Sequence, residues 1–184
     1  MPIRAPRHDE TDKGAVERAI FTEFAARYRA DIDIVSIRSG DPHRLEPDII
    51  AKSTESDAQI ACELIRLTQS DSQKMVSRAL QFPGIIDVQS LASLSLDAFS
   101  RKFEKHKKGL YAGVNPTELE LLAYSDFLVT PWPSVLSDIA NWFAANQIES
   151  SFTRAWLWSR PNYPSDPSEG VWLWEEGRGI TRFD

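Results

Sequence analysis

Apolar positions recur with two different periods along the chain, and these periods separate helices from strands. Residues 14–30 carry apolar side chains at the three- and four-residue spacing of an amphipathic helix. Residues 96–108 and 134–146 show the same spacing. Residues 68–81 are weakly helical, and residues 85–95 give no clean period. Three helices are therefore predicted with a clear buried stripe.

Other segments alternate between apolar and polar positions or are short and apolar throughout, as strands are. Residues 32–37 alternate, and residues 119–124 are almost all apolar, which predicts a strand at the centre of a sheet. Between them, residues 46–52 and 59–67 form two apolar runs separated by the polar segment 53–57. This arrangement predicts a hairpin.

The C-terminal part contains two near-copies of a four-residue apolar motif. Ala155-Trp156-Leu157-Trp158 and Val171-Trp172-Leu173-Trp174 each place two tryptophans on one face of a strand. The proline-rich segment 159–170 is expected to join them into a hairpin. The tryptophans could form a stacking surface for bases. The interpretation we favour packs most of them under the 134–146 helix, with at least two buried.

The order of these elements predicts an α/β domain over residues 14–184, preceded by a flexible tail at residues 1–13. Its mixed central sheet should have about five or six strands, with helices on both faces. The 184 residues, 42% hydrophobic and 26% charged, fit one globular domain. No apolar leader or membrane-length segment is present in the sequence, and Cys62 is the single cysteine, so a cytoplasmic location without membrane contact is expected.

Charge argues against a protein that coats nucleic acid, because the formal net charge is −6. Basic residues nevertheless gather within positions 101–108. This group could contact a phosphate backbone or form a solvated helix face. The residues proposed for nucleic-acid contact are Arg101, Lys105, Lys107 and Lys108.

Two carboxylates in the predicted hairpin are candidates for a metal site. Side chains alternate along strands, so Asp48 lies on one face of the first strand and Glu63 on one face of the second. If the strands pair antiparallel, the two carboxylates can meet at one end of the sheet. Two carboxylates there would suit a hard cation such as Mg²⁺ or Mn²⁺. By the same alternation, Cys62 should point away into the core.

These residues resemble the PD-(D/E)XK nuclease superfamily: Pro47-Asp48, then a hairpin strand with Glu63, then a lysine-bearing helix before a strand. The resemblance implies a restriction-endonuclease-like fold and metal-dependent hydrolysis of phosphodiester bonds in DNA or RNA. It implies metal ligands at Asp48, Glu63 and the backbone carbonyl of Leu64, with Glu17 pointing in from the first helix. A Glu17 that instead extends its carboxylate to solvent or pairs with an arginine is equally compatible with the sequence.

The sequence departs from this pattern at one position, because Ile65 stands where the superfamily has its lysine. Lys102, at the border of the apolar stripe of its helix, is the preferred substitute, followed by Lys105 and then Lys52. The predicted catalytic residues are therefore Asp48, Glu63, Lys102 and Lys105. The alternative is a catalytically degenerate nuclease-fold protein that acts as a binding, immunity-type or structural partner.

Overall fold

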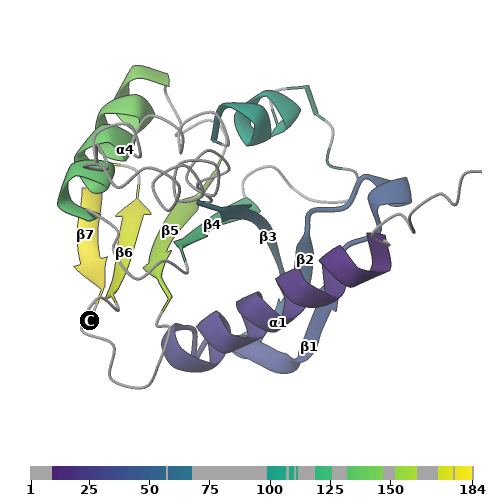
Figure 1. The fold of residues 1–184 in the computed structure, drawn as a ribbon. Helices are drawn as coiled ribbons and strands as arrows, with labels where there is room; N and C mark the ends of the chain where they lie inside the picture. The colour runs from purple at the N-terminus through teal and green to yellow at the C-terminus, as the bar shows by residue number, and fades with distance from the viewer. Residues whose placement is uncertain are drawn as a thin grey trace, which may run out of the picture.

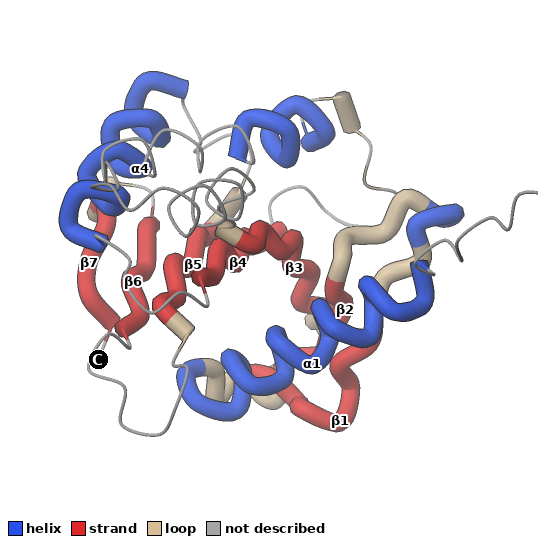
Figure 2. The backbone as a smooth tube through the Cα atoms, viewed as in Figure 1, coloured by secondary structure: helices blue, strands red, loops and turns tan. Residues whose placement is uncertain are grey.

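The computed structural model is an α/β structure in three layers. It describes residues 10–56, 58–67, 99–106, 108–109, 111, 119–125, 132–146, 152–160, 170–175 and 177–183. Helix α1 (Glu10–Tyr28) lies on one face of the sheet, and helix α4 (Trp132–Asn146) and a helix at residues 99–106 lie on the other (Figure 1). Figure 2 shows the strands as a curved sheet between these layers.

The sheet is mixed and follows the chain, in the order β1-β2-β3-β4-β5-β6-β7. Its strands are β1 Ile32–Ser39, β2 Ile49–Ser53, β3 Gln59–Arg66, β4 Leu119–Ser125, β5 Arg154–Ser159, β6 Gly170–Glu175 and β7 Gly179–Phe183. The pairs β3–β4 and β4–β5 are parallel and the others antiparallel. Parallel neighbours need long crossover connections. The 99–106 helix lies within the first of these connections and α4 within the second.

The hydropathy pattern predicted most of these elements, with differences at their ends. All residues of β4 are buried, as expected for the middle strand of a sheet covered on both faces. Helix α1 begins at Glu10 and not at Gly14. The last residues of the predicted tail are therefore helical.

The expectation of five or six strands was too low, because β7 makes a seventh. Its five residues alternate weakly and are mostly exposed, so their pattern gives little signal. Gly177 and Gly179, both at positive φ, form the turn that pairs β7 with β6. The predicted weak helix at 68–81 and the ambiguous 85–95 segment lie outside the described residues.

The tryptophan motifs pair as the predicted hairpin, but their side chains point to opposite faces. The β5–β6 register sets Trp156 opposite Leu173 and Leu157 opposite Trp172. Trp156 and Trp158 therefore pack on Phe24 of α1, at ring distances of 5.5 and 5.6 Å. The predicted packing under the 134–146 helix is therefore right for the second motif, which contains Trp174, and wrong for the first, which packs under α1.

Three of these four tryptophans are buried, which confirms the expected burial. Trp156, Trp158 and Trp174 are at most 6% exposed. Trp174 packs on Phe143 of α4, with ring centroids 5.4 Å apart. The burial leaves no room for the tryptophans to act together as a base-stacking surface.

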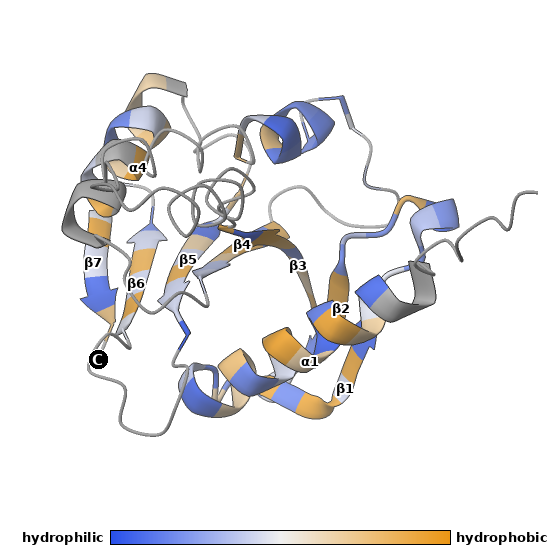
Figure 3. Cartoon of the chain, in the orientation of Figure 1, coloured by the Kyte–Doolittle hydropathy of each residue, from blue (hydrophilic) through white to orange (hydrophobic). Residues whose placement is uncertain are grey.

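Each face of the sheet has its own hydrophobic core. Phe21 and Phe24 of α1 are buried in the core on one face. Phe99 and Phe103 of the 99–106 helix are buried in the core on the opposite face. The rest of that helix is largely hydrophilic (Figure 3). Within the described residues, no helix combines the length and the apolar character needed to cross a membrane.

Candidate functional site

The β2–β3 register brings Asp48 and Glu63 together. Ile49 pairs with Cys62, so the antiparallel ladder continued by one residue sets Asp48 beside Glu63. Both side chains share the face covered by the 99–106 helix, while Cys62 points to the α1 core and is 1% exposed. The Leu64 amide donates a hydrogen bond of 2.9 Å to Asp48 Oδ2. The predicted convergence of the two carboxylates is confirmed.

The loop before β2 holds Asp48 at the strand entrance. It contains a short 3₁₀ helix, η1 (Pro42–Arg44), and the Gly40 amide donates to the Asp48 carbonyl at 2.9 Å. A Cβ on Gly40 would lie 1.7 Å from the Pro47 carbonyl oxygen, so only glycine fits there. Arg38 and the Asp41 amide both bind the Glu46 carboxylate and tie the loop to β1.

The 99–106 helix delivers two lysines to the carboxylates. Phe99 and Phe103 are buried against the sheet, and this packing fixes the orientation of the helix. The side of the helix that carries Lys102 and Lys105 therefore faces the two carboxylates. Lys102 Nζ binds Asp48 Oδ2 at 2.7 Å and also binds Glu63 Oε2. Lys105 Nζ lies 3.4 Å from Glu63 Oε1. The expectation that Lys102 reaches the site from this helix is confirmed.

Helix α1 contributes a further carboxylate and a further lysine. Glu17 is mostly buried and pairs with Lys13 at 3.2 Å, and Lys13 Nζ also lies 4.0 Å from Asp48 Oδ1. Glu17 thus approaches the site as expected, and its basic partner is Lys13 and not the arginine that the sequence suggested. Lys13 was missed because it fell in the predicted tail, although its four-residue spacing from Glu17 is a recognised pairing signal.

The electrostatics of the site follow from three carboxylates and three ammonium groups in a confined volume. Burial and the neighbouring Asp48 charge raise the pKa of Glu63 above its usual range, against the lowering effect of Lys102. The same two causes raise the pKa of Glu17. Burial also acts to raise the pKa of Asp48, but Lys102 and the Leu64 amide outweigh it and lower that pKa. The pKa of Lys102 is raised, because the charges of Glu63 and Asp48 outweigh its own burial.

Tyr111 also belongs to the site, where it lies beside Glu63 and Lys105, and it was not predicted from the sequence. Lys105 Nζ lies 4.4 Å from the centre of its ring, a cation–π contact. Burial, followed by the Glu63 charge, raises the pKa of the Tyr111 hydroxyl. A single tyrosine in a loop-like segment carries no periodic signal, so sequence reasoning had no means of finding it.

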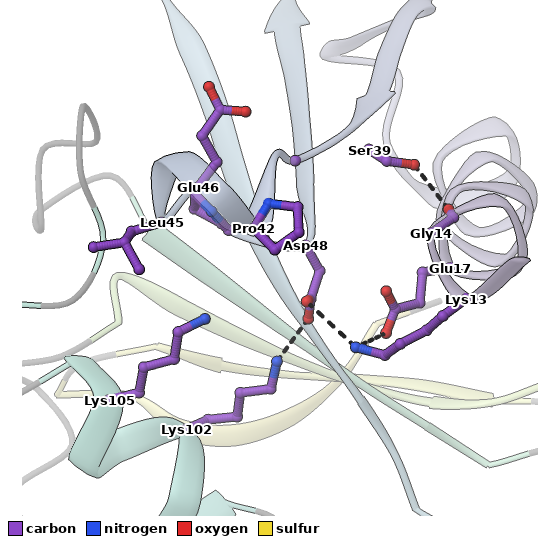
Figure 4. Close-up of a pocket in the computed structure, with 12 residues that line it drawn as sticks. Lys13, Gly14, Glu17, Ser39, Pro42, Leu45, Glu46, Asp48, Lys102 and Lys105 are labelled. Atoms are coloured by element: carbon purple, nitrogen blue, oxygen red, sulfur yellow. Dashed lines mark hydrogen bonds and ion pairs between the residues drawn. The ribbon is translucent and has the colours of Figure 1, made fainter. Parts of the chain in front are cut away.

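Two cavities adjoin this cluster. The first, about 320 Å³, is enclosed by α1, the loop before β2 and the 99–106 helix (Figure 4). The second, about 420 Å³, lies toward Leu64, Arg66 and Arg101. Both are lined by the same four residues, which are Lys13, Glu17, Lys102 and Lys105.

The remaining predicted residues have different positions. Ile65 is 3% exposed and belongs to the core shared with Phe99 and Phe103. Lys52 is exposed at the far end of β2, where it pairs with Gln59. Its proposal as a third candidate for the substitute lysine is therefore wrong. Arg101 and Lys108 are exposed on or just after the helix, while Lys107 lies outside the described residues.

A divalent cation can be accommodated by this donor set. No group of three or more His, Cys, Asp or Glu side chains with metal-ligand geometry occurs within the described part of the chain. Asp48 and Glu63 nevertheless converge on one cation, the Lys102 ammonium. Mg²⁺ keeps several waters and binds through one or two carboxylates, so this pair suits it. The ligand role expected of the Leu64 carbonyl stays a prediction, since the contact described here is through the Leu64 amide.

Comparisons with known proteins return no relatives. No protein-family model matches the chain, and no curated protein or solved structure matches it significantly.

Proposed function

We propose that this chain is a restriction-endonuclease-like protein that hydrolyses phosphodiester bonds in DNA or RNA with Mg²⁺ or Mn²⁺. The observation that carries the proposal is the bridge from Lys102 to both Asp48 and Glu63. A lysine from the following helix thereby supplies the ammonium that the hairpin lacks at Ile65. The order of the elements, with a helix, three antiparallel strands, a helix and a parallel strand, also supports the proposal.

The roles of the residues follow from their charges. Asp48 and Glu63 would hold the cation, which supplies a nucleophilic water and neutralises charge on the phosphate. Lys102 would orient the water and stabilise the charge that develops in the transition state. Glu17, whose carboxylate pairs with Lys13, would lie at the edge of the cation site and could serve as a further ligand. Lys105, held by Glu63 and Tyr111, is placed to contact the phosphate.

Cleavage of single- and double-stranded DNA and RNA in Mg²⁺ or Mn²⁺ tests this proposal. Asp48→Asn, Glu63→Gln and Lys102→Met should each lower the rate by about 100-fold or more, because each removes preorganised charge. The matched control is Lys52→Met, which removes an exposed lysine remote from the site. Circular dichroism of each variant separates loss of activity from loss of fold.

A rescue variant makes the test sharper. Ile65 follows Glu63 by two residues and lies on the same face of β3, beside the second cavity. Ile65→Lys in the Lys102→Met background would return an ammonium to the superfamily position, and part of the activity should return with it. Wild-type cleavage that persists in Asp48→Asn and Glu63→Gln would rule out this active site.

A second candidate is a catalytically degenerate binding protein, favoured by one observation. The Lys102 ammonium binds both carboxylates, so each of these buried charges has a cationic partner within the protein itself. Binding of Mn²⁺ to the wild-type protein, followed by electron paramagnetic resonance, separates the candidates. Mn²⁺ binding that is lost in Asp48→Asn supports the nuclease, and neither binding nor cleavage by the wild type supports the degenerate protein.

A further inference from the structure

The two cavities beside the site differ in the chemistry of their walls. The first has apolar side chains on its loop wall, from Pro42, Leu45 and Pro47. The second has the basic side chains of Arg66 and Arg101. The lysines and Glu17 that line both cavities lie where the two meet. A ligand spanning both cavities would therefore meet all three lysine ammonium groups at this junction.

The first cavity is a pocket with a fixed far wall. Leu45 has a φ of 57°, and its amide donates to the Pro42 carbonyl, so the loop holds it in a left-handed conformation at the rim. Leu45 is 47% exposed. The ion pair of Glu46 with Arg38 fixes the loop behind it. A polymer bound in this cavity would meet the loop as an ordered wall.

Size favours a ligand of one nucleotide in this pocket. A volume of about 320 Å³ lies at the lower end of the range for small-molecule sites, about 300–1,000 Å³. A duplex, roughly 20 Å across, could not enter it, whereas an unpaired base could lie against the apolar wall. The phosphate would lie toward Lys13, Lys102 and Lys105.

We infer that the first cavity is a binding subsite for one terminal nucleotide of a single strand. The strand would continue from the lysines across the second cavity, past Arg66 and Arg101. This inference rests on the proposed function and deepens it, because cleavage at the junction would then start from a strand end. Water adds to the phosphorus and the bond to the neighbouring ribose oxygen breaks, so the nucleotide in the pocket is released singly.

Binding of a nucleoside 5′-monophosphate, measured by calorimetry with Mg²⁺, tests the subsite without relying on cleavage. Asparagine and aspartate both tolerate the left-handed backbone at position 45. Leu45→Asn should therefore weaken binding about two- to threefold by removing apolar contact, whereas Leu45→Asp should weaken it about tenfold by also placing a negative charge at the rim. Lys52→Met should bind as the wild type does. Inorganic phosphate alone should bind more weakly, because it makes no contact with the apolar wall.

Cleavage of a linear single strand and of a closed circle with the same sequence tests the end requirement. We expect mononucleotides from the linear strand and no cutting of the circle. A circle cut as fast as the linear strand would overturn the inference and leave the proposed function intact. Nucleotide binding that is weakened in Leu45→Asp, without cleavage of any substrate, would support the subsite and overturn the proposed function. Absence of nucleotide binding, or equal affinity in Leu45→Asn and Leu45→Asp, would overturn the inference.

Discussion

At the residue scale, the site depends on the charge balance around Glu63. Its side chain is fully buried, and a buried carboxylate is costly unless it is paired and hydrogen-bonded. Lys102, 21% exposed, supplies this pairing. The loss of Lys102 would leave the Glu63 and Asp48 carboxylates facing each other without this cation between them.

Lys102→Met should lower the free energy of unfolding by about 3 kcal/mol, since buried Glu63 would keep only the more distant Lys105, 3.4 Å away, as a cationic partner. Adding Glu63→Gln should recover part of this loss, with a coupling of about 1–3 kcal/mol between the two positions. Urea denaturation of the four members of this cycle gives the coupling. Additive effects would show that Lys102 and Glu63 do not interact energetically.

The pH dependence of that variant should also change. The pKa of Glu63 is raised, so the folded protein holds its proton at a pH where the unfolded chain has lost it. Stability therefore falls as pH rises through the interval above the ordinary value of 4.5. Without Lys102 the pKa of Glu63 rises further and this interval widens, so Lys102→Met should lose more stability than the wild type as pH rises above 4.5. Adding Glu63→Gln to Lys102→Met should remove this difference in pH dependence from the wild type. Parallel profiles of unfolding free energy against pH for wild type and Lys102→Met would show that Glu63 does not cause it.

At the element scale, the loop between β1 and β2 decides where Asp48 lies. The loop reverses the chain within a space that admits no side chain at Gly40. It also contains Leu45 in a strained conformation, held by η1. The precision of the site therefore depends on loop packing and not on strand pairing alone.

Gly40→Ala should destabilise the protein by about 1–3 kcal/mol, the usual cost of overpacking, and should displace Asp48. Gly14→Ala is the matched control. Gly14 is in α1, and its added Cβ would lie 3.3 Å from the Ser39 hydroxyl oxygen, so a small shift accommodates it while helix propensity improves. Thermal unfolding compares the two variants. Equal stability of both would show that the loop adapts to the side chain.

At the scale of the whole molecule, a buried ion pair joins the N-terminal helix to the central strand. Arg29, just after α1, donates to Glu120 of β4 and to Asp31, at 2.5 and 2.7 Å. The Trp156 indole nitrogen donates to the same Glu120 carboxylate at 2.8 Å. Segments 91 residues apart in the chain are thus held together beneath α1.

Arg29→Met should lower the free energy of unfolding by about 3–5 kcal/mol, because Glu120 would remain buried without its partner. Arg178→Met is the matched control. Arg178 pairs with Glu175 in the β6–β7 turn and is 77% exposed, so its loss should cost less than about 1 kcal/mol. Denaturant unfolding of both variants measures the difference. A similar small effect for both would show that burial of the Arg29 pair adds nothing.

The sequence by itself determined the elements with strong periodicity and the relation between Asp48 and Glu63. Alternation in strands and the polar break at residues 53–57 sufficed to place both carboxylates on one face. The border position of Lys102 on an apolar helix stripe also sufficed to predict its approach. These are local properties, because a period and a turn fix side-chain direction within one element or one hairpin.

Only the tertiary structure decided which faces and which distant residues meet. The hairpin pairing of β5 and β6 sends Trp156 to α1 and Trp174 to α4, although their motifs are nearly identical. Lys13 and Tyr111 reach the site from separate elements. The spacing of Lys13 from Glu17 indicates a pair within one helix but not its approach to Asp48, and no local period marks Tyr111. Such contacts depend on the sheet register and on helix placement, which are set by burying both faces of the sheet at once and not by any single segment.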